Sequence, residues 1–322
     1  MHRRRGIAMR ELARKLFLLA VAGILAIAGD PTAIETRKAR ARALLERMDF
    51  RAALVEAEEV NRLAADDVVG YELMAAAQLA LGDYADAEKQ LQWMLDLRIG
   101  KASPGGWLLL ARFREVTGDM EGALEAVNQA YASLPSDLAS EQRVLMAYAG
   151  RLYYFQGKLE MASQAIQWAL ASSQTDPQAL EVLARIQLAR GNRADSIGTL
   201  RELLQRNAHP RYLYLLADAT GAAADYTAFE QAARQITASP DNANRELALY
   251  YAGRAKKPAE ALRIARDEAI RRHDVLTLDA LAVALFANHQ ADQARATMQG
   301  VLAVGTRDTE ILKHAVRIGV KP

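Results

Sequence analysis

A short corner that recurs along the chain constrains its fold more than any other feature of the sequence. The stretch "GDYADAEKQL" starts at Gly82, and related stretches with an alanine-rich run return at intervals of 32 to 39 residues. The copies are anchored at Met48, Gly82, Gly118, Gly157, Gly191, Ala224, Lys256 and His289. A period of about 34 residues is typical of stacked helical hairpins, because one hairpin cannot bury its apolar face alone.

Two positions in each copy are occupied mainly by small residues. Five residues after the anchors stand Ala53, Ala87, Ala123, Ala162, Ser196, Phe229, Ala261 and Ala294. Seven residues before them stand Ala41, Ala75, Ala111, Gly150, Ala184, Ala217, Leu249 and Ala282. The second set holds seven small residues, where the alanine and glycine content of the chain predicts about two. Small residues at both positions indicate that two helices of each copy cross closely.

Large residues and helix-start signals keep the same register. Eleven residues before the anchors stand Tyr71, Trp107, Met146, Leu180, Leu213 and Leu278, which can fill the space between neighbouring copies. Fourteen residues before the anchors stand Pro104, Pro177 and Pro210, and proline is favoured at the first position of a helix. A glycine at the corner can adopt the left-handed conformation that ends a helix. Each copy is therefore expected to be a helix-turn-helix unit.

The period, the two small columns, the large residues and the glycine corner together resemble the tetratricopeptide repeat (TPR), a helix-turn-helix unit of 34 residues. This resemblance implies an all-α protein, a right-handed α-solenoid of about eight TPR-like repeats over residues 30–304, with residues 305–322 as a C-terminal capping half-repeat. The pattern departs from the family in a 39-residue spacing around Pro135. It departs again in the sixth and seventh copies, where Phe229 and Leu249 replace small residues, and these copies are expected to be irregular or loosely packed.

The first 29 residues have the order of an export signal. A basic stretch precedes the uncharged apolar run Leu16 to Gly29, and Ala26-Ile27-Ala28 offers a small-x-small cleavage site. The run has fourteen residues, whereas a helix needs about 20 to cross a bilayer. We expect residues 1–29 to be a signal peptide or an N-terminal membrane anchor, so that the body is exported or held facing the periplasm. A buried first helix is the remaining alternative.

Charge and motif content argue against several classes of function. Beyond residue 15 the chain carries 35 Arg and Lys against 38 Asp and Glu, whereas nucleic-acid binding proteins carry a basic surplus. There is no cysteine, and the five histidines include no pair spaced four residues apart that would face one metal ion. No phosphate-binding, zinc-protease or nucleophile motif occurs. We expect no nucleic-acid partner, enzyme activity, catalytic residue, metal or cofactor.

One column suggests a binding site. In the TPR family certain first-helix positions line a concave groove, and the resemblance places the column six residues before the anchor on that surface. Arg112, Arg151 and Arg185 occupy it in successive copies, and the neighbouring groove candidates are Tyr154, Arg211 and Tyr214. Arginine offers a planar fork to carboxylates, so this groove predicts an acidic partner segment. In the alternative interpretation, Glu181 pairs with Arg185 and Glu115 with Arg112 inside their own helices.

The sequence thus predicts a non-enzymatic scaffold of the cell envelope that binds a protein or extended peptide in its concave groove, with an acidic segment as the partner that the arginine column indicates. Contact with the membrane is expected only through residues 16–29, if these are not cleaved. Two other functions stay open. One is a membrane-tethered adaptor on the cytoplasmic side, and the other is an enzyme built on an α-superhelical scaffold.

Overall fold

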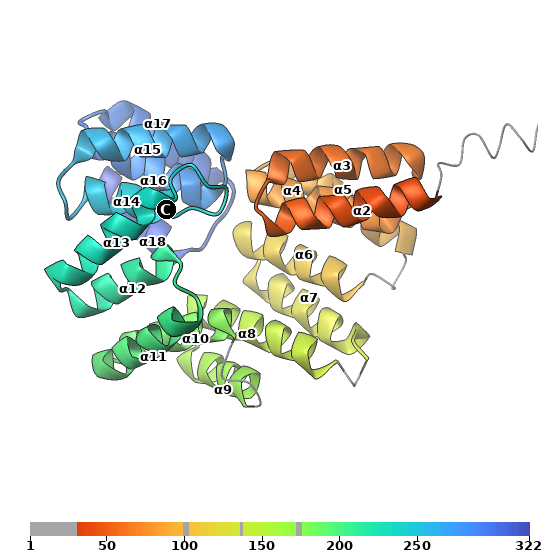
Figure 1. Ribbon diagram of the computed structural model, residues 1–322, viewed down its shortest axis with the longest axis horizontal. Coiled ribbons are helices and arrows are strands. Elements are labelled where there is room, and N and C mark those ends of the chain that lie inside the picture. The colour runs from red at the N-terminus through yellow and green to blue at the C-terminus, as the bar shows by residue number, and fades with distance from the viewer. Residues whose placement is uncertain (1–30, 99–102, 136–137, 172–175) are drawn as a thin grey trace, which may run out of the picture.

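The computed structural model describes residues 31–98, 103–135, 138–171 and 176–322 (Figure 1). These residues form seventeen α-helices and no strand. The segment predicted to be a signal peptide or anchor lies outside the described residues. None of the helices in the described ranges combines the length and the apolar character needed to cross a membrane.

The helices form eight antiparallel hairpins and one final single helix. The first helices of the hairpins are α2 (Pro31–Glu46), α4 (Val68–Leu81), α6 (Pro104–Val116), α8 (Ala139–Phe155), α10 (Pro177–Ala189), α12 (Pro210–Thr220), α14 (Asn244–Ala252) and α16 (Val275–Ala287). The second helices are α3 (Phe50–Leu63), α5 (Tyr84–Arg98), α7 (Met120–Ser133), α9 (Leu159–Leu170), α11 (Arg193–Arg206), α13 (Ala223–Gln235), α15 (Pro258–Arg271) and α17 (Ala291–Ala303). Helix α18 (Thr309–Ile318) packs on α16 and α17, where the first helix of a ninth hairpin would lie. The predicted all-α solenoid is confirmed.

Helix starts and corners follow the predicted local chemistry. Ser103 Oγ and Asp176 Oδ1 accept hydrogen bonds from backbone amides of the helices that begin at Pro104 and Pro177, at 2.9 and 2.8 Å. Seven of the eight anchor residues have a positive φ, and three of them are not glycine, namely Met48, Lys256 and His289. The corner is thus a left-handed helix end even where its residue type is unfavourable for that conformation.

Both small columns lie at helix crossings, as predicted. All sixteen column positions are buried. In the fourth hairpin, a Cβ atom on Gly150 would lie 2.7 Å from the Ile166 Cδ1 atom, so no larger residue fits there without rearrangement. In the fifth hairpin, Ser196 Oγ donates a 2.8 Å hydrogen bond to the Ala184 carbonyl and joins the two columns directly.

The sixth hairpin corrects the predicted position of one corner. Helix α12 ends at Thr220 and the left-handed residue is Gly221, with φ of 70°, three residues before the anchor at Ala224. The turn is displaced by almost one helical turn, while Ala217 and Phe229 remain fully buried. The Phe229 ring lies 5.0 Å from the Tyr214 ring and 5.7 Å from the Tyr250 ring, centroid to centroid. The sixth and seventh copies are therefore irregular, but they are not loosely packed.

The array curves until its two ends meet, which the sequence did not predict. In Figure 1 the orange helices α3 to α5 face the blue helices α15 to α17 across the top of the molecule. Hydrogen bonds that involve the backbone make much of the contact: His273 N donates to the Leu81 carbonyl at 2.7 Å, and Val275 N donates to the Tyr84 hydroxyl at 2.9 Å. The Arg51 guanidinium donates to the carbonyls of Ile270 and Arg271, at 2.9 and 3.3 Å. We call this contact the seam. It joins Arg51 and residues 81–84 and 117–118 to residues 270–275 and 305–307.

Two corner glycines lie in the seam, and here their missing side chain matters. A Cβ atom on Gly82 would lie 2.5 Å from backbone atoms of His273 and Asp274, and one on Gly118 would lie 2.1 Å from the Gly305 carbonyl oxygen. The equivalent Gly157 and Gly191 have no atom within 4 Å of such a Cβ. The seam thus depends on close backbone approach at two of the five glycine corners, since Gly221 also has open space around it.

Candidate binding surface

Polar side chains from successive first helices meet one another across the boundaries between hairpins. We call the surface that they form the inner surface. Its charged and aromatic residues are Arg112, Glu115, Tyr148, Arg151, Tyr154, Glu181, Arg185, Arg211, Tyr214, Asp218, Arg245, Glu246, Tyr250, Asp279, Glu310 and His314. Five arginines stand among six carboxylates in this set, so the surface is not basic as a whole.

The contact between α6 and α8 centres on Glu115. Its carboxylate pairs with Arg151 at 2.9 Å and accepts a hydrogen bond from the buried Tyr148 hydroxyl. The Arg151 guanidinium also lies over the Phe155 ring, 5.4 Å from its centroid. Burial acts most strongly on the pKa of Arg151 and lowers it, but the effects of Glu115, Tyr148 and Glu181 together outweigh burial and the pKa is raised. Arg151 is therefore held in a fixed, charged position.

Glu181 joins α10 to α12. Its Oε1 accepts two hydrogen bonds from Arg185, at 3.0 and 3.1 Å, and its Oε2 accepts one from Arg211 at 2.5 Å. Burial acts to raise the pKa of Glu181, but the two guanidinium groups outweigh it and leave the pKa lowered. One carboxylate thus holds two of the predicted groove arginines.

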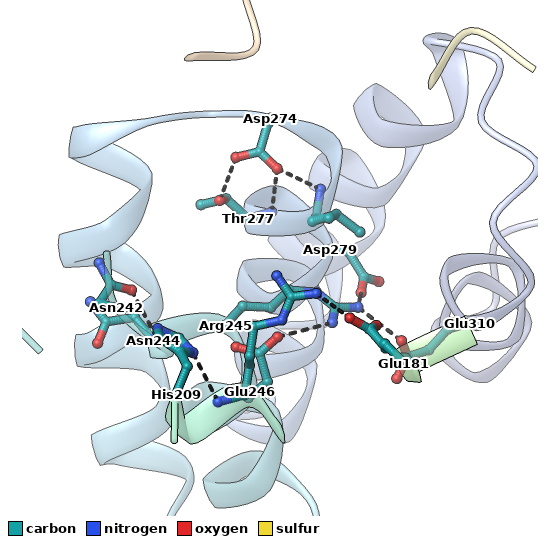
Figure 2. A network of polar contacts seen from close by, with 12 residues as sticks. Glu181, His209, Asn242, Asn244, Arg245, Glu246, Asp274, Thr277, Asp279 and Glu310 are labelled. Carbon is teal, nitrogen blue, oxygen red and sulfur yellow. Dashed lines mark hydrogen bonds and ion pairs between the residues drawn. The ribbon is translucent and has the colours of Figure 1, made fainter. Parts of the chain in front are cut away.

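Arg245 forms the corresponding centre between α14, α16 and α18 (Figure 2). Its guanidinium lies 3.0 Å from Glu310, 3.6 Å from Glu246 and 3.7 Å from the fully buried Asp279. The two carboxylate oxygens of Asp279 also lie 2.9 and 3.0 Å from His314 Nδ1, within hydrogen-bonding distance. Burial acts to lower the pKa of Arg245, but the surrounding carboxylates outweigh it and raise the pKa. This cluster fixes the last helix to the array.

The predicted groove residues divide into three groups. Arg151, Arg185 and Arg211 are paired with glutamates, and the predicted pairing of Glu181 with Arg185 is present. Tyr154 and Tyr214 are half-buried, with their rings against Phe155 and Phe229. Arg112 is exposed and forms no ion pair or hydrogen bond with another described residue, because Glu115 turns to Arg151 of the next hairpin instead. Arg112 is thus the candidate cation that remains available.

Sequence reasoning named Glu115 and Glu181 as partners for arginines of their own helices, but it missed the Arg245 cluster and the pairing of these acids with Arg151 and Arg211 of the next hairpin. A further column carried the signal: ten residues before the anchors stand Glu181, Glu246 and Asp279. Each of these carboxylates lies within 3.7 Å of an arginine of the inner surface. No group of three or more His, Asp or Glu residues in the described part of the chain is placed to hold a metal ion.

A cavity of about 230 Å³ lies where the seam closes the array. Its apolar lining comes from both ends of the chain and comprises Leu79, Ala80, Tyr84, Val116, Met120, Phe155, Val275, Leu276 and Ile311. Charged residues at its wall are Glu115, Arg151, Arg272, Asp274 and Asp308. The sequence did not predict this cavity, because its two sides lie about 190 residues apart in the chain.

Comparison with known proteins identifies the repeats. Residues 73–137 and 149–208 match the family model of the tetratricopeptide repeat. A search of curated proteins found no match.

The solved structures that match this chain include two with a TM-score above 0.5, which show the shared fold. One is a thermophilic TPR protein of Thermus thermophilus, with 19% identity and a TM-score of 0.52, covering 59% of this chain and all of its own. The other is PilW, a widely conserved type IV pilus biogenesis factor, with 16% identity and a TM-score of 0.51, covering 65% of this chain and 94% of its own. Identities this low show the fold alone. The matched residues are thus tetratricopeptide repeats, and the sixteen buried column positions extend the same hairpin pattern to all eight copies.

Proposed function

We propose that this protein is a non-enzymatic scaffold of the cell envelope, which binds a protein or an extended peptide on its inner surface. The observation that supports binding is the accessibility of that surface. The side chains of Arg151, Arg185 and Arg211 are 39%, 36% and 46% exposed even though each is held by a glutamate. A partner therefore meets charged and aromatic groups that are already fixed in position, which lowers the entropic cost of binding.

The acidic character of the partner is proposed for one contact only. A partner carboxylate at Arg185 or Arg211 competes with Glu181, which already accepts hydrogen bonds from both arginines. At Arg112 no described side chain competes for the guanidinium. We therefore place the acidic group of the partner beside Arg112.

Binding affinity tests this proposal. A partner is first captured by crosslinking in the native host, and its affinity is then measured for the wild type, Arg112→Glu and Arg201→Glu at low and high salt. Arg201 is an exposed residue of the second helix α11 and serves as the matched control. Arg112→Glu should weaken binding about tenfold or more at low salt, corresponding to about 1.4 kcal/mol, and added salt should narrow the gap because it screens exposed charges. Equal affinities for the two variants would contradict the proposed site.

Location in the cell envelope is proposed from the sequence order of residues 1–29. Intact-mass measurement of the native protein tests it, together with protease accessibility in spheroplasts. Loss of about 28 residues, or digestion of a full-length anchored chain from outside, is the expected result. A full-length chain protected from protease would favour the cytoplasmic-side adaptor.

A further inference from the structure

The cavity at the seam is built from two ends of the chain that come together only in the closed array. Leu79, Ala80 and Val116 come from the second and third hairpins, whereas Val275, Leu276 and Ile311 come from the eighth hairpin and the last helix. If the seam opens, the two walls separate. The cavity therefore exists only while the seam is closed, and its shape depends on closure as well as on local packing.

The charged groups at its wall are already engaged inside the protein. Asp274 and Asp308 cap α16 and α18 by accepting from backbone amides, at 3.1 and 3.3 Å and at 2.8 and 3.2 Å respectively. Arg272 pairs with Glu268 at 2.9 Å, and Glu115 pairs with Arg151. A charged ligand group entering this cavity would have to displace one of these partners. The remaining lining is mainly apolar, and the hydroxyl oxygens of its polar members Thr306 and Tyr84 already accept hydrogen bonds from the backbone amides of Asp308 and Val275, so the group that fits best is uncharged and apolar.

The size of the cavity limits which apolar group can enter it. Sites for small organic ligands usually have volumes of about 300 to 1,000 Å³, and this cavity is smaller, at about 230 Å³. That volume suits one bulky aliphatic or aromatic side chain. Arg112 lies four residues before Val116 on α6, which is one helical turn and therefore the same face of the helix. An acidic residue that binds Arg112 would thus lie close to a side chain that enters the cavity.

We propose that the seam cavity receives one bulky apolar side chain of the partner, such as leucine or phenylalanine, next to the acidic residue at Arg112, and that its binding favours the closed seam. This inference rests on the proposed function, since it assigns the partner's chemistry at the same surface. A side chain that contacts both walls binds only the closed array. By linkage it stabilises closure, and closure in turn raises its affinity.

The first experiment uses defined peptides. Two capped hexapeptides, identical except for a central phenylalanine or alanine and each carrying two glutamates, are titrated against the full chain by fluorescence anisotropy. The phenylalanine peptide should bind at least tenfold more tightly. Ala80→Leu, which fills the cavity, should remove this preference, and Ala189→Leu should not. Ala189 occupies the same repeat position as Ala80, two residues before the anchor of the fifth copy, where it is exposed and away from the seam.

The second experiment separates the seam from the cavity wall. Gly118→Ala places a Cβ atom against the Gly305 carbonyl, whereas Gly157→Ala imposes the same left-handed strain with open space around it. Only Gly118→Ala should reduce the affinity for the phenylalanine peptide. Hydrogen exchange at the amides of His273 and Val275, which donate across the seam, should slow when that peptide is added to the wild type.

The outcomes are distinguishable from those of the proposed function. If the phenylalanine and alanine peptides bind equally, or neither binds, the apolar site at the seam is wrong, while an Arg112-dependent native partner would still support the scaffold. If Gly118→Ala does not fold, the comparison of Ala80→Leu with Ala189→Leu still tests whether the cavity binds the phenylalanine side chain. If Ala80→Leu and Ala189→Leu lose the preference for the phenylalanine peptide to the same extent, the inference is also overturned.

Discussion

The second to fifth hairpins and the sixth and seventh hairpins solve the same packing problem with different residues. In the regular group the crossing pairs are Ala75 with Ala87, Ala111 with Ala123, Gly150 with Ala162, and Ala184 with Ser196. In the irregular group Phe229 faces Ala217, and Leu249 faces Ala261. Every crossing keeps at least one small residue. The close crossing of two helices therefore requires a small residue at one of the two facing positions, and not at every position of both columns.

A large residue at a crossing is accompanied by changes around it. Beside Phe229 the turn has moved to Gly221, and the rings of Tyr214 and Tyr250 pack against the phenylalanine ring. Beside Leu249, helix α14 is shortened to nine residues. The irregular hairpins thus have a different local backbone and an equally closed core.

The largest effect that tests this comparison is expected from Phe229→Ala. Removing a fully buried ring from a crossing that has adapted to it should leave a cavity and lower the free energy of unfolding by about 3–5 kcal/mol. Chemical denaturation measures the change, with Phe155→Ala as a control because Phe155 is only half-buried. A loss below that of the control would show that the aromatic residues do not support this crossing.

A smaller effect is expected when a regular crossing is made larger. Ala87→Leu or Ala162→Leu should lower the free energy of unfolding by about 1–3 kcal/mol through overpacking, because the opposing helix has not moved to accept the side chain. Ala85→Leu, at an exposed position of the same helix as Ala87, should change stability little. Denaturation midpoints equal to that of the wild type in both variants would mean that the crossings of the regular group are as adaptable as those of the irregular group.

The smallest effect concerns the junction between the two groups, where Glu181 joins α10 to α12. Its pKa in the folded protein is lowered from 4.5, so its stabilising contribution is present above that pH and is lost as the pH falls through the folded value. Glu181→Gln should cost about 1–2 kcal/mol near pH 7, and the difference from the wild type should shrink in acid. Glu202→Gln breaks a more exposed pair with Arg206 and should cost less, about 0–1 kcal/mol. A constant difference from pH 7 to pH 3 would exclude the ionised pair as its cause.

The fold could be predicted because its rules are local. Residues at fixed distances from the corner, such as Ala162 and Gly150, contact each other within one hairpin, so the period alone places them at the crossing. The turn at Gly221 was missed because the buried pair Ala217 and Phe229 keeps its register while the turn between them moves. The seam was missed because it depends on the total of small rotations between successive hairpins. No pair of residues in the sequence indicates how large this total rotation is.

The candidate surface could be predicted only in part, for a related reason. The arginine column correctly located side chains on the first helices, but the partner of Arg151 comes from the preceding hairpin and a partner of Glu181 comes from the following one. Such pairs depend on the stacking angle between hairpins. Considering one column alone therefore predicted a basic groove where the structure has alternating charges, with Arg112 as the exception.

The seam also changes how the chain must fold. In an open solenoid each repeat contacts only its neighbours, so terminal repeats can fray and a nucleus can form anywhere along the array. Here Asp83 and Tyr84 contact residues about 190 positions away, and Arg51 reaches a carbonyl 219 positions away. Joining such distant segments increases the entropic cost of loop closure and raises the contact order, and both effects slow folding. The ends of the array are thus tied together, so that fraying of the second hairpin from its corner also requires release of residues 273–275, which lead into the eighth hairpin.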